Sequence, residues 1–302
     1  GVIDSPDIPL NVSRSYLQSD GNVKKISSHI TKKVADKLAE MFKKDRKDFE
    51  SKWDDLQVFV QYGMLSEDKF AEKAKTFSLF KNTEGTCFTI DEYREKVSAL
   101  QTDKDGKLIL LYANNKEEQF AFIKKAKDRG YDVLHLDGPL VSHWLPKLEQ
   151  SNDNISFVRV DSDSLDKLIR KSDEIPSKMS KEEEEKIKPL FEATINKEKY
   201  TVQLESMSED DAPIIITQPE FIRRMMEQQK LGGGNGFYGA FPEMFTMTVN
   251  TNHPKIHGLL SKSELDQTTG VKQLTDLALL AQGLLKGEAL NSFIERNINE
   301  LA

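Results

Sequence analysis

The sequence predicts a mixed protein of two domains, the first α/β with a large helical part and the second α+β. Residues 22–99 carry apolar side chains at three- and four-residue steps, the spacing of amphipathic helices. Across residues 106–165, apolar runs typical of strands alternate with helical segments. Residues 180–302 combine a few strands with helices. We therefore expect one domain at 1–172 and another at 180–302.

The first domain is expected to contain a helical segment over residues 22–99. Its first stretch, 22–44, places apolar residues on one face and lysines on the other, the pattern of a helix with one solvated side. Three shorter helices are predicted at 45–61, 66–80 and 89–99.

A small α/β subdomain is expected over residues 106–165. Apolar runs predict strands at 107–113, 130–136 and 155–160, and the segments 116–129 and 141–150 between them are helical in pattern. Strands that alternate with helices form βαβ units, so we expect a small parallel sheet with right-handed crossovers.

The second domain follows a charged segment over residues 161–185, which reads as a linker leading into a helix. Strands are predicted at 200–205, 213–217 and 244–249, and helices at 220–230, 270–286 and 288–301. A glycine-rich stretch at 232–236 predicts a flexible connection after the first of these helices.

Composition excludes several classes of protein. The chain has 302 residues, of which 31% are charged, and a net charge of −7, which argues against nucleic acid as the main partner. The sequence contains no apolar run near the length of about 18 residues that a membrane helix needs. The single Cys87 cannot form an intrachain disulfide and fits a reducing compartment, so we expect a cytoplasmic protein.

The first eighteen residues, GVIDSPDIPLNVSRSYLQ, are too apolar for a solvated tail and too rich in proline for a helix. They predict an extended loop that packs on a core and presents Arg14 and Gln18. The planar guanidinium of an arginine binds phosphate or carboxylate through two parallel hydrogen bonds. Alone, such an arginine is more often a structural or solvated residue.

This stretch resembles the catalytic-loop signature of the ninety-kilodalton heat-shock chaperones, in particular the bacterial HtpG type. The match is long and unbroken, and Ser15 is one departure, standing where the family usually has an acid. The resemblance extends over essentially the whole chain, including the α/β unit near 106–145 and the final third. It implies the later part of a middle domain (1–172) followed by a C-terminal dimerisation domain (180–302), as a portion of a longer protein.

The resemblance implies a role for the opening loop in ATP hydrolysis. In the family, the arginine at the position of Arg14 reaches the γ-phosphate of ATP, which is held with magnesium by an N-terminal domain. Gln18 and Asn11 would help to hold the loop or the phosphate. The present residues would bind no nucleotide or other cofactor and would not hydrolyse ATP by themselves.

The resemblance also implies surfaces that contact unfolded or partly folded client proteins. Phe221, Met225 and Met226 lie on one predicted helix, and soft methionine side chains suit the binding of varied sequences. Trp144 matches a family tryptophan that touches substrate protein. For all four side chains the alternative is ordinary core packing.

The two closing helices predict a homodimer. Two hydrophobic faces at the end of a chain commonly need a partner, and the family pairs these helices in a four-helix bundle across a two-fold axis. Packing within the chain is the alternative. The expected interface residues are Leu274, Leu277, Ala281, Leu284, Leu290, Phe293, Ile294 and Leu301.

A metal site is not expected, because His253 and His257 lack a third ligand.

Two other classes of protein remain open. The first is a free-standing dimeric interaction scaffold. The second is a small α/β enzyme that uses the Arg14 loop on a phosphorylated substrate, although the sequence shows neither a nucleotide pocket nor a general base for it.

Overall fold

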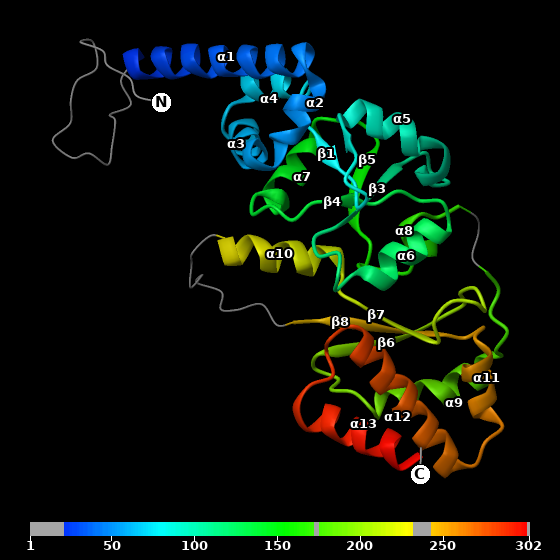
Figure 1. The fold of residues 1–302 in the computed structure, drawn as a ribbon. Coiled ribbons are helices and arrows are strands. Elements are labelled where there is room, and N and C mark those ends of the chain that lie inside the picture. Colours follow the sequence, from blue (N-terminus) through cyan, green and yellow to red (C-terminus); the bar gives the residue numbers. More distant parts are fainter. Residues whose placement is uncertain (1–20, 172–174, 232–242, 301–302) are drawn as a thin grey trace. The chain divides into compact units, whose positions relative to one another are not determined.

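The computed structural model describes residues 21–171, 175–231 and 243–300. Contacts divide the chain into two compact units, which we call the first unit (Gly1–Glu95 with Gly138–Lys147) and the second unit (Lys96–Asp137 with Leu148–Ala302). These units do not follow the order of the chain, and the domain division at 172–180 stays a prediction. Figure 1 shows the elements of each unit.

Four helices open the described part of the first unit: α1 (Gly21–Lys44), α2 (Arg46–Ser51), α3 (Trp53–Ser66) and α4 (Asp68–Ala74). The single helix predicted at 45–61 is therefore two helices. Asp45 caps α2 by accepting a hydrogen bond from the backbone N–H of Asp48 at 3.0 Å. The predicted helix at 66–80 is shorter, because a two-stranded ladder of β1 (Phe80–Lys81) and β2 (Cys87–Phe88) begins at its expected end.

Aromatic side chains form the interior of the first unit. Phe49 packs against Trp53 and Phe77, with ring centroids 6.0 and 6.2 Å away. Helix α7 (Val141–Gln150) adds Trp144, which stacks on Phe80 at 4.9 Å with the rings 11° apart. Such aromatic pairs are worth roughly 0.5–1.5 kcal/mol beyond the area they bury.

The second unit contains the predicted parallel sheet, in the order β4-β3-β5. It consists of β3 (Leu108–Ala113), β4 (Leu134–His135) and β5 (Ile155–Arg159), with α5 (Ile90–Gln101), α6 (Phe120–Asp128) and α8 (Leu165–Leu168) nearby in the chain. Both partners of β3 run parallel to it, which confirms the α/β prediction. All six residues of β3 are buried, as expected for the central strand of a parallel sheet.

The same unit holds a second sheet, in the order β6-β8-β7. Its strands are β6 (Tyr200–Glu205), β7 (Ile214–Thr217) and β8 (Phe245–Asn250); β6 pairs parallel with β8, and β7 antiparallel. The helices of this part are α9 (Lys181–Glu192), α10 (Glu220–Leu231), α11 (Pro254–Leu260), α12 (Glu264–Ala281) and α13 (Gly287–Glu300). Phe191, Met247, Val249 and Val271 are fully buried in the core between this sheet and its helices. The mixed α/β and α+β class is confirmed.

Among the described residues, none of the helices has the length and apolar character that crossing a membrane requires.

Candidate functional site

Helix α10 orients its side chains in an unusual way. Phe221 is 71% exposed, whereas Arg223, two positions later, is only 3% exposed. Aromatic side chains usually face the interior and arginines are almost never fully buried without partners. The helix therefore presents its phenylalanine outward and directs an arginine into the protein, where it must find hydrogen-bond acceptors.

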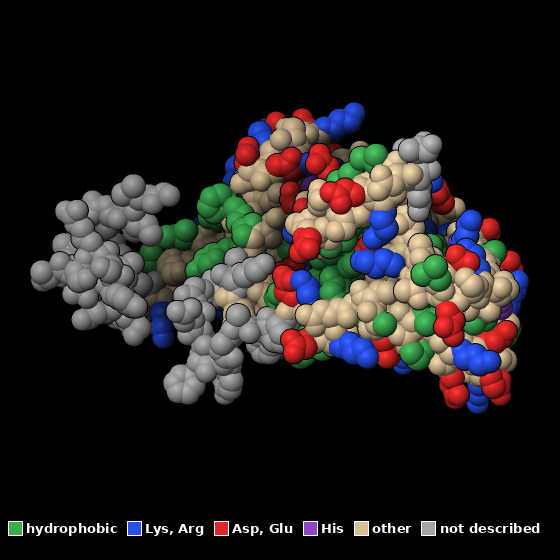
Figure 2. Space-filling model, turned by 90° about the horizontal axis from the view of Figure 1, so that it is seen from below, with side chains coloured by type: hydrophobic (Ala, Val, Ile, Leu, Met, Phe, Trp, Pro, Cys, Tyr) green, Lys and Arg blue, Asp and Glu red, His purple; other side chains and the backbone are tan. Residues whose placement is uncertain are grey.

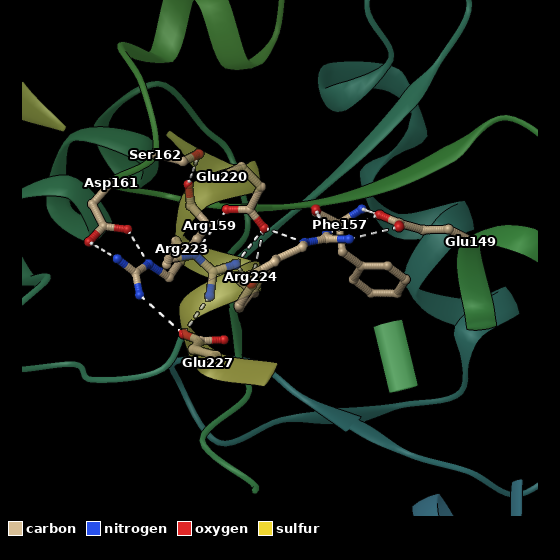
Figure 3. A network of polar contacts seen from close by, with 10 residues as sticks. Glu149, Phe157, Arg159, Asp161, Ser162, Glu220, Arg223, Arg224 and Glu227 are labelled. Carbon is tan, nitrogen blue, oxygen red and sulfur yellow. Dashed lines mark hydrogen bonds and ion pairs between the residues drawn. The ribbon is translucent and has the colours of Figure 1, made fainter. Parts of the chain in front are cut away.

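Arg223 finds these acceptors on its own helix and on the parallel sheet. It donates to Glu220 at 2.5 Å and to Glu227 at 2.5 Å, both on its own helix (Figure 3). It also donates to the hydroxyl of Tyr112 on β3, and its guanidinium carbon lies 5.6 Å from the centre of that ring. The cation is thus paired with two carboxylates and stacked against an aromatic face, which compensates for its burial.

Arg224 makes the second attachment of α10, to strand β5 and helix α7 (Figure 3). Its guanidinium donates to the two carboxylate oxygens of Glu149 at 3.0 and 3.2 Å and to the backbone carbonyl of Phe157 at 2.6 Å. The backbone N–H of Phe157 donates to the same Glu149 at 2.7 Å. Arg224, Glu149 and the peptide groups of Phe157 therefore form a closed ring of charge-assisted hydrogen bonds.

The electrostatics of this cluster favour its charged form. Burial alone would raise the pKa of Glu220, but the attraction of Arg223 and Arg224 outweighs burial and holds that pKa below its usual value. Burial raises the pKa of the Tyr112 hydroxyl, so it stays protonated at neutral pH. Arg159, paired with Asp161 at 2.5 Å, also approaches Glu227 at 3.7 Å and extends the cluster.

A polar cavity of about 380 Å³ lies beside the cluster, at the ends of β3, β5 and β7. Its lining includes Arg159 and Asp161 and the amide side chains of Asn114, Gln119 and Gln218. Gln119 is 4% exposed, and its carbonyl oxygen accepts from the backbone N–H of Asn114 at 2.9 Å. The lining is thus dominated by amides and one ion pair, which suits polar groups better than an apolar ligand.

The predicted client-contact residues occupy different environments. Phe221 is exposed and Met225, four positions later on the same helix face, is half-buried; these two side chains form what we call the outer part of α10. Met226 is also half-buried, and its sulfur accepts from the side chain of Gln218 at 3.5 Å. Trp144 is 1% exposed, stacks on Phe80 and donates its indole N–H to the sulfur of Met64 at 3.3 Å. A direct contact between Trp144 and a partner does not fit this position, and the core-packing alternative does.

Some apolar residues of the two closing helices, α12 and α13, pack within the chain, and others are exposed to solvent. Leu274 and Leu284 pack against the core of the second unit, and Phe293 is 8% exposed. Leu290 is half-buried. The exposed apolar residues in the later part of α12 and in α13 include Leu277, Leu280, Ala281, Ile294 and Ile298, and Leu265 in the first turn of α12 is exposed as well. The sequence prediction missed Leu280 and Ile298, although the four-residue spacing from Ile294 to Ile298 is that of one helix face.

A buried carboxylate joins the two closing helices. Asp276 of α12 is fully buried and pairs with Lys272 at 2.6 Å and with Arg296 of α13 at 2.6 Å. The side chain of Gln273 also donates to Asn297 at 2.9 Å. These bonds hold α12 and α13 as one element, so the exposed apolar residues of the two helices can act together.

Three predicted ATP-contacting residues, Arg14, Gln18 and Asn11, lie outside the described residues, and so does Leu301 of the predicted dimer interface. Within the described ranges, no group of three or more His, Cys, Asp or Glu side chains could hold a metal ion. Figure 2 shows a face on which acidic and basic side chains are interspersed.

Comparison with known proteins defines the class to which this fold and these surfaces belong. The family model described as Hsp90 protein matches residues 1–296. The chain therefore belongs to the Hsp90 family of molecular chaperones.

Its curated relatives are of the bacterial HtpG type. The chain is 44% identical, over 365 aligned positions, to chaperone protein HtpG of Porphyromonas gingivalis, with 98% of this chain and 53% of that protein covered. It is 40% identical to chaperone protein HtpG of Bacteroides thetaiotaomicron, covering 99% of this chain and 54% of the relative. A more distant HtpG, from Bdellovibrio bacteriovorus, is 26% identical over 94% of this chain and 45% of its own length. The chain spans about half the length of these relatives.

Proposed function

We propose that this chain is the middle and C-terminal part of a cytoplasmic, ATP-dependent chaperone. It binds and remodels partly folded client proteins as a clamp-like homodimer. The client surface is the outer part of α10, and the dimer surface is the exposed apolar face of α12 and α13.

The observation that carries this proposal is the reversed orientation of α10. Phe221 is 71% exposed while the arginine two positions later is 3% exposed. A helix that places charge inside and an aromatic ring outside costs stability, and a partner that covers the ring would offset that cost. The half-buried side chains of Met225 and Met226 on the same helix are flexible enough to adapt to many apolar side chains, as a chaperone for varied clients requires.

The dimer part of the proposal rests on the apolar residues that α12 and α13 leave exposed. Leu277, Leu280 and Ile294 are 46%, 40% and 46% exposed, and Ile298 is 59% exposed. Apart from Leu265 in the first turn of α12, the other large apolar side chains of these helices are buried or half-buried, and a partner that covers the exposed ones would offset the cost of their exposure. A second copy of the same helices offers a self-complementary surface in a two-fold dimer.

We assign ATP and magnesium to the N-terminal domain of the full-length protein. Arg14 would neutralise the charge that develops on the transferred γ-phosphate once the domains dock, and Gln18 and Asn11 would hold the loop or the phosphate. In the full-length chain, Arg14→Ala should lower ATPase activity by at least about tenfold and leave ATP binding nearly unchanged. Equal turnover by both proteins would remove this role.

The test of client binding uses an unfolded model protein and a matched pair of variants. Phe221→Ser should weaken binding about tenfold, the loss of about 1.4 kcal/mol that removing one contact aromatic causes. Phe120→Ser is the control, because Phe120 opens another helix and is similarly exposed at 65%. If the chain is a scaffold without client affinity, neither the unsubstituted chain nor either variant will bind the unfolded model protein. An equal loss of binding in both variants would refute the assignment of the client surface to α10.

The dimer is tested by sedimentation at tens of micromolar. The unsubstituted chain should sediment as a dimer, and the double variant Leu277→Glu with Ile294→Glu as a monomer. Leu265→Glu is the matched control, because Leu265 is 77% exposed on the same helix and lies outside the proposed interface. A monomer without any substitution would refute the dimer proposal. ATP turnover by residues 1–302 alone would favour the enzyme alternative.

A further inference from the structure

Strand β5 is an edge strand, and its outward peptide groups need partners. In the sheet order β4-β3-β5, no strand among the described residues lies on the outer side of β5. The N–H of Phe157 donates to Glu149 at 2.7 Å and its carbonyl accepts from Arg224 at 2.6 Å. An uncovered strand edge exposes such groups and invites pairing with other chains, and proteins usually cover it. Here a salt bridge between two helices covers it (Figure 3).

The Arg224 side chain reaches this edge from α10, the helix of the proposed client surface. It bonds both oxygens of Glu149 at 3.0 and 3.2 Å, and Glu220 of its own helix at 2.7 Å. Its side chain is 19% exposed, and that of Glu149 is 22% exposed. The arrangement uses most of the donors of the guanidinium at once, which a lysine could not do.

Arg223 supports the same docking from the next position. Its side chain is 3% exposed, and outside its own helix the partner found among the described residues is the Tyr112 hydroxyl. Its carboxylate partners, Glu220 and Glu227, move with the helix. If α10 left the sheet, Arg223 would keep these two partners, whereas Arg224 would lose Glu149 and the carbonyl of Phe157.

We propose that Arg224 and Glu149 are positioning residues, which tie α10 to the free edge of β5 and thereby aim Phe221 outward. This inference rests on the proposed function, because Phe221 matters only if α10 binds clients. The pair couples two events. When α10 detaches, the orientation of its apolar face is no longer fixed, and the peptide groups of Phe157 become uncovered at the same time. The position of the client helix thus depends on an ion pair with the α/β part of the unit.

Hydrogen exchange on the free protein tests the positioning role without any client. Arg224→Met should raise the exchange rates of the α10 amides at least about tenfold, because the helix loses its anchor. The Phe157 amide should also exchange faster, because its acceptor Glu149 loses the cation that holds it in place. Glu149→Gln should raise them less. The double variant should exchange no faster than Arg224→Met alone, because both substitutions break the same ring of bonds. Unchanged exchange in α10, or rates that multiply in the double variant, would overturn the proposal.

Two further variants separate positioning from a general loss of structure. Arg46→Met is the control, because Arg46 makes a similar bidentate pair with Glu92 in the first unit and should leave α10 exchange unchanged. Arg224→Lys keeps the charge, but a lysine cannot bond all the partners of Arg224 at once. Its α10 exchange rates should therefore lie between those of the unsubstituted chain and those of Arg224→Met. In every variant, slow exchange in β6 and β8 shows that the second sheet is folded.

Client binding is measured separately from hydrogen exchange, so that the two proposals can fail independently. Arg224→Met should weaken binding of the unfolded model protein. Its affinity should also depend less on salt concentration than that of the unsubstituted chain, because the ion pair that salt screens is missing. If Phe221→Ser leaves client binding unchanged while the exchange results hold, the proposed client surface fails and the anchoring does not. If exchange in α10 is indifferent to Arg224 and Glu149, the anchoring fails whatever the client data show.

Discussion

Replacing Trp144 by alanine should destabilise the first unit instead of removing a surface contact. The indole is 1% exposed, stacks on Phe80 at 4.9 Å and donates to the sulfur of Met64 at 3.3 Å. Truncation of a buried Trp or Phe to alanine costs about 3–5 kcal/mol, because the removed surface returns to water and a cavity remains. The stacking accounts for roughly 0.5–1.5 kcal/mol of that loss.

Fluorescence gives a direct assay for this unit. The chain has two tryptophans, and both Trp53 and Trp144 lie in the first unit at 1% exposure. In the variant, Trp53 alone reports on unfolding by urea. With an m-value of about 2 kcal/mol per molar, a loss of about 4 kcal/mol moves the midpoint down by about 2 M. Trp144→Phe, which keeps a ring to stack on Phe80, should lower the midpoint less.

The opposite result would refute the reasoning. If Trp144→Ala unfolds at the same urea concentration and binds an unfolded model protein more weakly, the side chain is a client contact. The same conclusion would follow if acrylamide quenched Trp144 in the folded protein as readily as a free indole.

Two further predictions concern a close approach and an ion pair, both within the first unit. Gly63→Ala should lower stability by about 1–3 kcal/mol, because overpacking a tight site costs that much; the added Cβ would stand 2.7 Å from the ring of buried Phe70. At Gly258 an added Cβ would meet no atom within 4 Å outside its own stretch of helix backbone, so Gly258→Ala should instead stabilise that helix by about 0.5–1 kcal/mol. Equal shifts of the two melting temperatures would contradict this contrast. The hydrogen bond from Arg46 lowers the pKa of Glu92 from 4.5 to about 2, so the pair contributes fully above pH 4.5 and its contribution disappears as the pH falls toward 2. Because the Glu92 side chain is 43% exposed, screening reduces this contribution to about 1 kcal/mol. Glu92→Gln should remove that part of the acid sensitivity, and unfolding curves between pH 5 and about 3 that keep the same pH slope would refute it.

The apolar periodicity of the sequence predicted most of the elements, because it reflects which face of each element is buried. The strands β3, β5, β6, β7 and β8 lie where apolar runs predicted them. Interruptions within a periodic stretch were harder to predict. Between α2 and α3 the apolar pattern of Phe49 and Trp53 continues, and the break at Lys52 comes from capping and a local backbone turn. Such a turn costs little and leaves no mark on hydrophobic spacing.

The candidate site shows a different limit. The sequence predicted the apolar members of α10 but not the role of its arginines, because a charged residue on a helix usually faces water. The partners of Arg224 are 75 and 67 residues away in the chain, at Glu149 and Phe157. The partner of Arg223 on β3 is 111 residues away. Pairings at that separation depend on how the strands are arranged, which spacing along a single helix does not report.

The place of α10 in the topology has a consequence for how the family can vary. The helix lies within the connection between β7 and β8, residues 218–244, and these two strands pair antiparallel from Ile214 with Val249 to Thr217 with Thr246. Their register is held by their own hydrogen bonds and by the buried residues of the sheet, so it does not depend on the sequence of the helix. The connection can therefore be exchanged without changing how β7 and β8 pair, as long as the graft keeps the arginine that bonds Glu149. Grafting the corresponding segment of a relative between positions 218 and 244 should change which unfolded proteins bind at the proposed client surface and leave α12 and α13, the proposed dimer helices, unchanged.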